Sequence, residues 1–366
     1  SNLTTGTDII TSTMTSGNDS ITATYTATAA TDTLSAGDVV VDVSSSDSDT
    51  ITVNTTLGAL GTTPAFGTVS GVENIVFNNI DVRNYSEIEK LLIDNQFDNI
   101  FHFAAQVAMT ESIQNPKEDM EINFLSTFNL LESIRKFSKE TVLVYTSSNK
   151  VYGDLSWDKF SKNDSRYIST LFPKGYDESA KIDFSGPYGC SKGSADLYAL
   201  DYYKTYNVKS VVLRLSTIYG PNQYATENQG WIGWFINEAI RQRNLSNPSF
   251  DISGDGLQVR DILYIDDLMS LCTKIVESTS KSIYGNAFNI GGGCENSLSI
   301  IELFENFIKS KVLDNKNYKL NFKERRLADQ LIFISSNKKI EELLNWKPQI
   351  QFHDGLRMYL DWLEKI

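Results

Sequence analysis

A tyrosine and a lysine lie four positions apart in the stretch GPYGCSKG, which spans residues 186–193. If the chain continues from there as a helix, Tyr188 and Lys192 lie one turn apart on the same face. A nearby ammonium favours the phenolate and moves the pKa of a tyrosine toward working pH. The pair therefore predicts a proton-transfer site in which Tyr188 is the group that moves protons.

Small and hydroxyl-bearing residues at two predicted strand ends support this site. Ser147 and Ser148 end the apolar run TVLVYTSS (141–148), and FHFAAQ (101–106) ends an earlier apolar run in small residues. In an open parallel sheet, ligands bind at the carboxyl ends of the strands. A Y-x-x-x-K pair alone also fits an ordinary amphipathic helix. A serine at a strand end upstream of the pair makes the joint signal for a site much stronger.

The elements that would position these residues alternate between strands and helices. Hydrophobic patterning predicts strands over 74–82, 99–105, 141–148 and 208–216, and helices over 85–94, over 117–137 and beyond Tyr188. Strands that alternate with helices imply a parallel sheet with right-handed crossovers. The sequence therefore predicts an α/β fold of the doubly wound, Rossmann-like class.

Composition narrows the classes of function. The 366 residues carry a net charge of −13, which argues against a nucleic-acid partner. We find no apolar run long enough for a membrane span and no signal-peptide pattern at the start. The 3 cysteines fit reduced thiols rather than disulfides. With only 2 histidines, His102 and His353, neither a metal site nor a Ser-His-Asp triad is expected.

A break in composition divides the chain. Residues 1–82 contain no Lys or Arg and are rich in threonine, so all 33 basic residues follow from Arg83 onward. We expect a Thr/Ser/Asp-rich β segment over 1–75, with strands near 20–29 and 49–57, and a second domain over 76–366. The composition of the first segment resembles that of bacterial surface-layer and secreted β-repeat proteins. A threonine-rich segment without any ligand is the alternative.

Several long runs in the second domain carry a more specific resemblance. They are AAQVAMTESIQNP (104–116), SNKVYGDL (148–155), GYDESAKIDFSGPYGCSKGSADLYALDY (175–202), QYATENQGWIGWF (223–235), ISGDGLQVRDILYIDDL (252–268) and GNAFNIGGG (285–293). From about residue 80 to 366 the chain resembles the extended short-chain dehydrogenase/reductases, the NAD-dependent nucleotide-sugar epimerases and dehydratases. Within that family it is most similar to enzymes that invert C2 of CDP-linked dideoxyhexoses.

The resemblance implies a role for each matching residue. Tyr188 would remove the sugar hydroxyl proton as hydride leaves to NAD, Lys192 would hold the nicotinamide ribose, and Ser148 would bond the reacting oxygen. NAD would be regenerated in each turnover and stay bound. The implied cofactor-binding residues are Asp81, Val82, Ala104, Ala105, Gln106, Tyr188 and Lys192. Arg260 and Arg326 match arginines that clasp the nucleotide diphosphate, although both also fit plain surface ion pairs. The substrate-binding parts would lie mainly in 220–366.

The start of the chain departs from the family pattern. The family begins with a strand and a G-x-x-G-x-x-G turn that binds pyrophosphate. In TVNTTLGALGTTPAFG the third glycine is replaced by Pro64, and only 22 residues separate Gly58 from Asp81. A helix, a strand and a second helix need more than about 30. We therefore expect a Rossmann-like domain that lacks its first strand-helix-strand portion.

Two readings follow from these observations. In the first, the chain is an NAD-dependent CDP-sugar epimerase of the cytoplasm that serves surface polysaccharide synthesis. Its partners would be a small CDP-sugar and, as the resemblance implies, further copies of itself. In the second, it is a recombined surface-layer-like hybrid, destined for the cell surface, whose epimerase portion is inactive because the NAD loop is absent.

Overall fold

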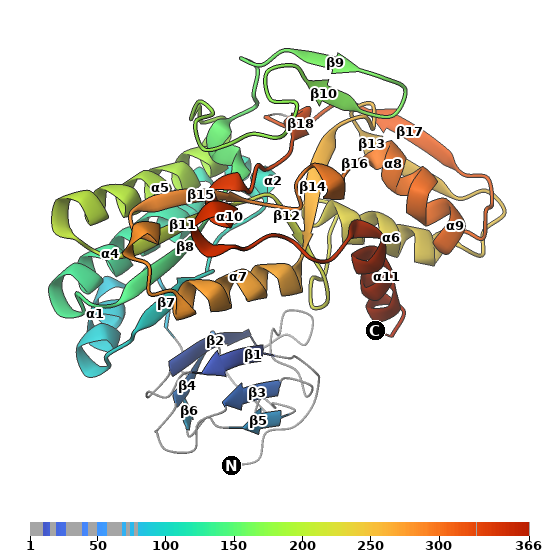
Figure 1. Ribbon diagram of the computed structural model, residues 1–366. Coiled ribbons are helices and arrows are strands. Elements are labelled where there is room, and N and C mark those ends of the chain that lie inside the picture. The colour runs from blue at the N-terminus through green and yellow to red at the C-terminus, as the bar shows by residue number, and fades with distance from the viewer. Residues whose placement is uncertain are drawn as a thin grey trace. The chain divides into compact units, whose positions relative to one another are not determined.

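The protein is described from a computed structural model (Figure 1). The structure describes residues 80–326 and 328–365 and, before residue 80, the backbone of six short strands. Within the described residues no helix has the length and apolarity needed to cross a membrane. The chain divides into two compact units, one built from 1–104, 125–144 and 201–210, the other from 105–124, 145–200 and 211–366.

The six strands before residue 80 form two parallel sheets. They are β1 (Ile10–Met14), β2 (Ser20–Thr26), β3 (Val39–Asp42), β4 (Thr50–Thr56), β5 (Thr68–Ser70) and β6 (Asn74–Val76). The strand orders are β1-β3-β5 and β2-β4-β6, so the chain alternates between the two sheets. Ser20 lies opposite Thr50, and Thr50 lies opposite Asn74. The strands predicted within 20–29 and 49–57 are confirmed, whereas the one predicted over 74–82 is shorter and pairs with β4.

The central sheet follows the predicted alternation. Its strands are β7 (Asn99–His102), β8 (Val142–Ser148), β11 (Ser210–Leu215) and β15 (Asn286–Ile290), in the order β15-β11-β8-β7. β11 and β15 pair in parallel, with Val211 opposite Asn286. All residues of β8 are buried, as expected for the central strand of a sheet with both faces covered. The expected doubly wound α/β fold is therefore confirmed for this part of the chain.

Helices connect these strands. They are α1 (Tyr85–Asp94), α2 (Met109–Gln114), α3 (Pro116–Met120), α4 (Ser126–Phe137) and α5 (Gly186–Tyr206). α1 matches its predicted range because Ile88 and Leu92, four positions apart, bury one face. The helix predicted over 117–137 is interrupted: between α3 and α4 the turn Glu121–Leu125 is π-helical. α5 begins on Gly186, so Tyr188 lies in its first turn.

The C-terminal part adds smaller sheets and helices. Its strands are β9 (Phe160–Lys162), β10 (Tyr167–Ser169), β12 (Thr217–Tyr219), β13 (Ser249–Ser253), β14 (Val259–Tyr264), β16 (Ser297–Ser299), β17 (Lys319–Lys323) and β18 (Ile332–Phe333). Its helices are α6 (Trp231–Gln242), α7 (Ile265–Glu277), α8 (Ile300–Leu303), α9 (Lys309–Lys311), α10 (Lys338–Leu344) and α11 (Phe352–Leu363). β14 pairs with β12 and β18 in parallel and with β16 in antiparallel fashion.

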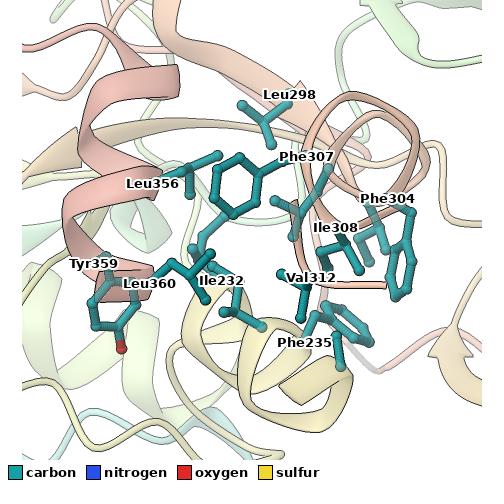
Figure 2. Packing of buried hydrophobic residues seen from close by; sticks show 14 of the residues in the cluster. Ile232, Phe235, Leu298, Phe304, Phe307, Ile308, Val312, Leu356, Tyr359 and Leu360 are labelled. Atoms are coloured by element: carbon teal, nitrogen blue, oxygen red, sulfur yellow. The ribbon is translucent and has the colours of Figure 1, made fainter. Parts of the chain in front are cut away.

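One large apolar cluster packs α6, α11 and the helical stretch 300–312 of this C-terminal part together. Figure 2 shows side chains from α6, from the helical stretch 300–312 and from α11 converging on one another. Ile232, Phe304 and Leu356 are each fully buried in it. Burial of such side chains stabilises a fold by about 1.5–3 kcal/mol each. The cluster thus supports β14, the strand that carries Arg260.

Candidate active site

Ser148 and Tyr188 meet at the carboxyl end of β8. Ser148 is the last residue of that strand and caps the short 3-10 turn Asn149–Tyr152, because its side chain accepts a hydrogen bond from the backbone N–H of Lys150 at 3.2 Å. The Ser148 hydroxyl lies near enough to the Tyr188 phenol to lower the pKa of that phenol. The structure therefore brings together the two hydroxyl groups that the sequence predicts to act together.

Lys192 lies one helical turn beyond Tyr188, but it does not lower the pKa of that tyrosine. Its Nζ donates to the backbone carbonyl of Thr146 and lies 4.6 Å from the ring centre of Tyr145. Burial raises the pKa of Tyr188 to about 12, against the effect of the Ser148 hydroxyl. Burial also lowers the pKa of Lys192 to about 7, a shift that Asp196 and Asp119 oppose. The predicted downward shift of the Tyr188 pKa is wrong here, because burial outweighs the attraction that we assigned to the ammonium.

A buried carboxylate beside these groups escaped the sequence analysis. Asp119 in α3 accepts a hydrogen bond from the Ser191 hydroxyl and another from Asn123 Nδ2 at 3.2 Å. Burial raises the pKa of its carboxyl group. Asn123 Oδ1 in turn accepts from the backbone N–H of Gln106 at 2.9 Å. These polar contacts connect the first turn of α5 to the segment that follows β7.

The remaining residues of the predicted cofactor site have different surroundings. Asp81 is exposed and accepts hydrogen bonds from the Arg83 backbone and guanidinium, which lower its pKa. Val82 follows it in a turn, and Ala104 and Ala105 follow β7 in irregular backbone. Contacts of these four residues with a cofactor stay a prediction.

The two predicted substrate arginines differ in burial. Arg260 in β14 donates from Nη2 to Asp329 Oδ1 at 2.7 Å and to the backbone carbonyl of Gln330 at 2.9 Å. Arg326 is exposed and donates to the backbone carbonyl of Glu227 at 2.7 Å. Arg260 is therefore held rigidly, whereas Arg326 has a single hydrogen-bond partner, a backbone carbonyl, among the described residues.

The segment around Gln330 is joined to the turn after Ser148 by amide side chains. Asn149 Nδ2 donates to Gln330 Oε1 at 3.0 Å, and Gln330 Nε2 donates to the backbone carbonyl of Gly153 at 2.7 Å. Lys150 Nζ lies 3.4 Å from Asp329 Oδ1, the oxygen that Arg260 also contacts. Sequence reasoning missed Asn149, Lys150 and Gln330. The signal was present, because Asn149 and Lys150 directly follow Ser148 in SNKVYGDL, and Gln330 stands four positions after Arg326.

A buried ion pair between Arg214 and Asp196 lies next to the end of β8. Arg214 in β11 donates to both carboxylate oxygens of Asp196, at 2.8 and 2.9 Å, and to the Tyr152 hydroxyl at 2.9 Å. The Ser147 hydroxyl donates to the same carboxylate at 2.8 Å. Asp196 lies one turn after Lys192 in α5. The ion pair thereby fixes α5 against β11, and the Ser147 hydrogen bond fixes it against β8.

Replacing Gly153 by alanine should destabilise the protein by about 2–4 kcal/mol. Its φ of +70° disfavours any L side chain, and a Cβ there would overlap the backbone carbonyl oxygen of Asp183. Gly186→Ala is the matched control, because its φ is +77° but a Cβ would meet only Ala328 at 3.9 Å. Urea unfolding of both variants measures the difference. Equal losses in the two variants would show that the overlap at Gly153 costs nothing.

Comparison with known proteins identifies the family of this chain. A family model described as GDP-mannose 4,6 dehydratase matches residues 34–359. The CDP-paratose 2-epimerase of Salmonella typhi is 42% identical over 310 residues, which cover 85% of this chain and 90% of that protein. The match over 34–359 begins inside the segment that we likened to surface-layer proteins, and the comparisons do not support that likeness. Thr/Ser/Asp-rich composition alone was too unspecific a signal.

Two solved structures share the fold. UDP-glucose 4-epimerase of Thermotoga maritima with UDP-glucose has a TM-score of 0.69 at 22% identity, covering 87% of this chain and 91% of that one. dTDP-glucose 4,6-dehydratase of Bacillus anthracis in complex with NAD has a TM-score of 0.63 at 25% identity, covering 87% and 88%. The fold is therefore the Rossmann-like one of nucleotide-sugar epimerases and dehydratases. With this fold, with Ser148 beside Tyr188 and with a relative at 42% identity, the chain belongs to the GDP-mannose 4,6 dehydratase family of nucleotide-sugar epimerases and dehydratases.

Proposed function

We propose that this chain is an NAD-dependent epimerase that inverts C2 of a CDP-linked dideoxyhexose by transient oxidation and return of the hydride. The observation that carries the proposal is the pairing of Ser148 with Tyr188 at the end of β8, in a chain 42% identical to a CDP-paratose 2-epimerase. The inactive-hybrid reading is not favoured, because that identity extends over 310 residues. The catalytic domain would span 76–366.

Three side chains would carry the proton chemistry. Tyr188 would take the proton from the sugar hydroxyl at C2 and return it after the hydride has come back to the other face of the sugar. Ser148 would hold the reacting oxygen by a hydrogen bond. Lys192 would bind the nicotinamide ribose through its ammonium. When bound, NAD supplies the acceptor and donor of the hydride and is unchanged at the end of each turnover.

The residues after β7 fit such a cofactor. Gln106 donates from Nε2 to the backbone carbonyl of Ala108 at 2.8 Å, but its Oε1 is buried with no hydrogen-bond partner among the described residues. An unsatisfied buried acceptor costs about 1–3 kcal/mol, so a ligand hydroxyl such as that of a ribose would stabilise it. Ala104 and Ala105 carry no bulk that would keep a ligand from the backbone. Asp81 and Val82 would lie toward the adenine.

The proposal is tested by incubating the purified chain with CDP-paratose and NAD and following the sugar by proton NMR. Inversion at C2 without net formation of NADH is expected, because the hydride returns to the same carbon. Accumulation of a keto sugar, or no change at C2 with added NAD, would refute the proposed reaction. UDP-glucose and dTDP-glucose serve as control substrates, and neither should react.

The absence of a glycine-rich turn leads to a separate prediction about affinity. Residues ahead of Asp81 include no G-x-x-G-x-x-G sequence and no basic side chain. Charge-assisted backbone hydrogen bonds contribute about 1.5–3 kcal/mol each, so losing two weakens binding by at least about a hundredfold. We expect the chain to be purified without NAD and to bind it that much more weakly than the Salmonella typhi relative. Stoichiometric NAD released on denaturing the purified chain would contradict this.

A further inference from the structure

We infer that Lys150 and Arg260, held together by Asp329, form the anion site for the substrate's diphosphate, with Lys150 as the cation next to the reacting sugar. This inference deepens the proposed function and rests on it. Arg260 was assigned to the diphosphate by resemblance alone, whereas nothing assigns Lys150 or Asp329. Three observations on the described residues support the inference: where Lys150 stands, how the charges balance, and how few bonds its ammonium makes.

The backbone of Lys150 lies between the two hydroxyl-bearing residues. Its N–H donates to Ser148 Oγ at 3.2 Å. On the other side, a Cβ placed on Gly189 would come within 2.9 Å of the Lys150 carbonyl oxygen. Gly189 directly follows Tyr188, so its lack of a side chain allows this close approach. Lys150 is therefore fixed beside both residues that we expect to contact C2 of the sugar.

The charges in this cluster do not balance. Lys150 Nζ and Arg260 Nη2 lie 3.4 and 2.7 Å from the same oxygen, Asp329 Oδ1, and the side chains of Lys150, Arg260 and Asp329 are only 13%, 12% and 22% exposed. Two cations share one carboxylate, which leaves one positive charge uncompensated. Burial lowers the pKa of Lys150 to about 8, with Asp329 opposing this shift and Arg260 adding to it. A partly buried, uncompensated cation is costly until an anion binds.

The ammonium of Lys150 also has N–H donors that lack an acceptor among the described residues. An ammonium can donate three hydrogen bonds, and within the described part of the chain Nζ makes one, at 3.4 Å to Asp329. That distance is long for a charge-assisted bond, which is typically about 2.7–2.9 Å. Phosphate oxygens would supply the missing acceptors.

The position of the phosphate in the substrate completes the argument. C2 of the sugar is bonded to C1, and C1 carries the phosphate. If C2 lies at Ser148 and Tyr188, the nearer phosphate must lie within a few bond lengths, where Lys150 stands. To receive hydride on its other face, the keto sugar must turn while the diphosphate stays bound. The planar guanidinium of Arg260 is fixed by three acceptors, whereas Lys150 has a long flexible stem that can follow the phosphate.

The test measures binding of CDP by isothermal titration calorimetry in the full chain. Lys150→Met should weaken CDP binding about ten- to hundredfold, and Lys150→Arg should recover most of it because it keeps the charge. Lys162→Met is the matched control: Lys162 also lies 3.4 Å from a carboxylate, that of Asp255, but its side chain is 55% exposed. This control should bind CDP like the unsubstituted chain. Thermal melting confirms that each variant is folded.

Different results refute the inference and the proposed function. If folded Lys150→Met binds CDP as tightly as the unsubstituted chain, the inference is wrong even if C2 epimerisation occurs. If CDP binding depends on Lys150 but CDP-paratose is not epimerised, the anion site stands and the proposed reaction fails. If the unsubstituted chain binds none of CDP, UDP and dTDP, the anion site is refuted.

Discussion

Replacing Tyr188 by phenylalanine should slow C2 epimerisation by about 10²–10⁴-fold, the usual contribution of a general acid–base group. The substitution removes one oxygen atom and leaves the ring that packs in the first turn of α5. The lost hydroxyl is the one beside the Ser148 hydroxyl, so the sugar oxygen would face a hydrocarbon edge at the moment its proton has to leave. Binding of CDP should change little, because our diphosphate site does not include Tyr188.

The measurement is a steady-state NMR assay under saturating NAD, together with CDP titration. Tyr198→Phe is the control: it lies in the same helix, with 43% of its surface exposed, and its ring packs edge-on against Phe124 at 5.2 Å. That variant should retain full activity. A Tyr188→Phe protein that epimerises within about threefold of the unsubstituted rate would remove Tyr188 from the mechanism.

The second large effect concerns stability. Replacing Asp196 by alanine should lower the free energy of unfolding by about 3–5 kcal/mol, because it leaves the Arg214 guanidinium buried without a counter-charge. The side chains of Arg214 and Asp196 are only 4% and 1% exposed. Burial by itself lowers the pKa of Arg214, and the hydrogen bonds and charge of Asp196 together with Tyr152 more than reverse that effect. The Ser147 hydroxyl would lose its acceptor in the same variant.

Urea unfolding near neutral pH measures this loss. Asp201→Ala is the matched control on the same helix, since Asp201 is exposed and, among the described residues, its side chain accepts one long hydrogen bond, from the Thr205 hydroxyl at 3.3 Å. It should change the free energy of unfolding by no more than about 0.5 kcal/mol. If Asp196→Ala costs less than about 1 kcal/mol, Arg214 does not depend on its partner as we argue.

The sequence was informative where local pattern decides structure. α1 has the predicted bounds, and β8 ends on Ser148 as expected, because apolar periodicity specifies the helix and a short apolar run rich in β-branched residues specifies the strand. The Y-x-x-x-K pair and a serine at a strand end then sufficed to place Tyr188 beside Ser148. Each of these inferences needed only neighbours along the chain.

The sequence was uninformative where partners far away along the chain decide which residues are buried. The helical pattern over 117–137 would place Met120 among the apolar residues, yet Met120 is 44% exposed and the neighbouring Asp119 is buried. Asp119 tolerates burial because Ser191, 72 positions later, donates to it. Gln330 likewise bonds Asn149 across 181 positions. The pKa of Tyr188 was misjudged for the same reason, since burial is a property of the folded chain.

The π-helical turn at Glu121–Leu125 has a consequence for how this protein tolerates changes in length. A π-turn holds one residue more than an α-turn, so it is the local structure expected where one residue is inserted into an α-helix. Deleting one residue inside it would let the helix rewind as α, whereas a deletion in α3 or α4 would rotate one part by about 100° against the other. Within the stretch from α3 to α4, deletion scanning should therefore find a tolerant position between 121 and 125. That deletion would displace Asn123, whose side-chain amide makes hydrogen bonds to both the Gln106 backbone and Asp119.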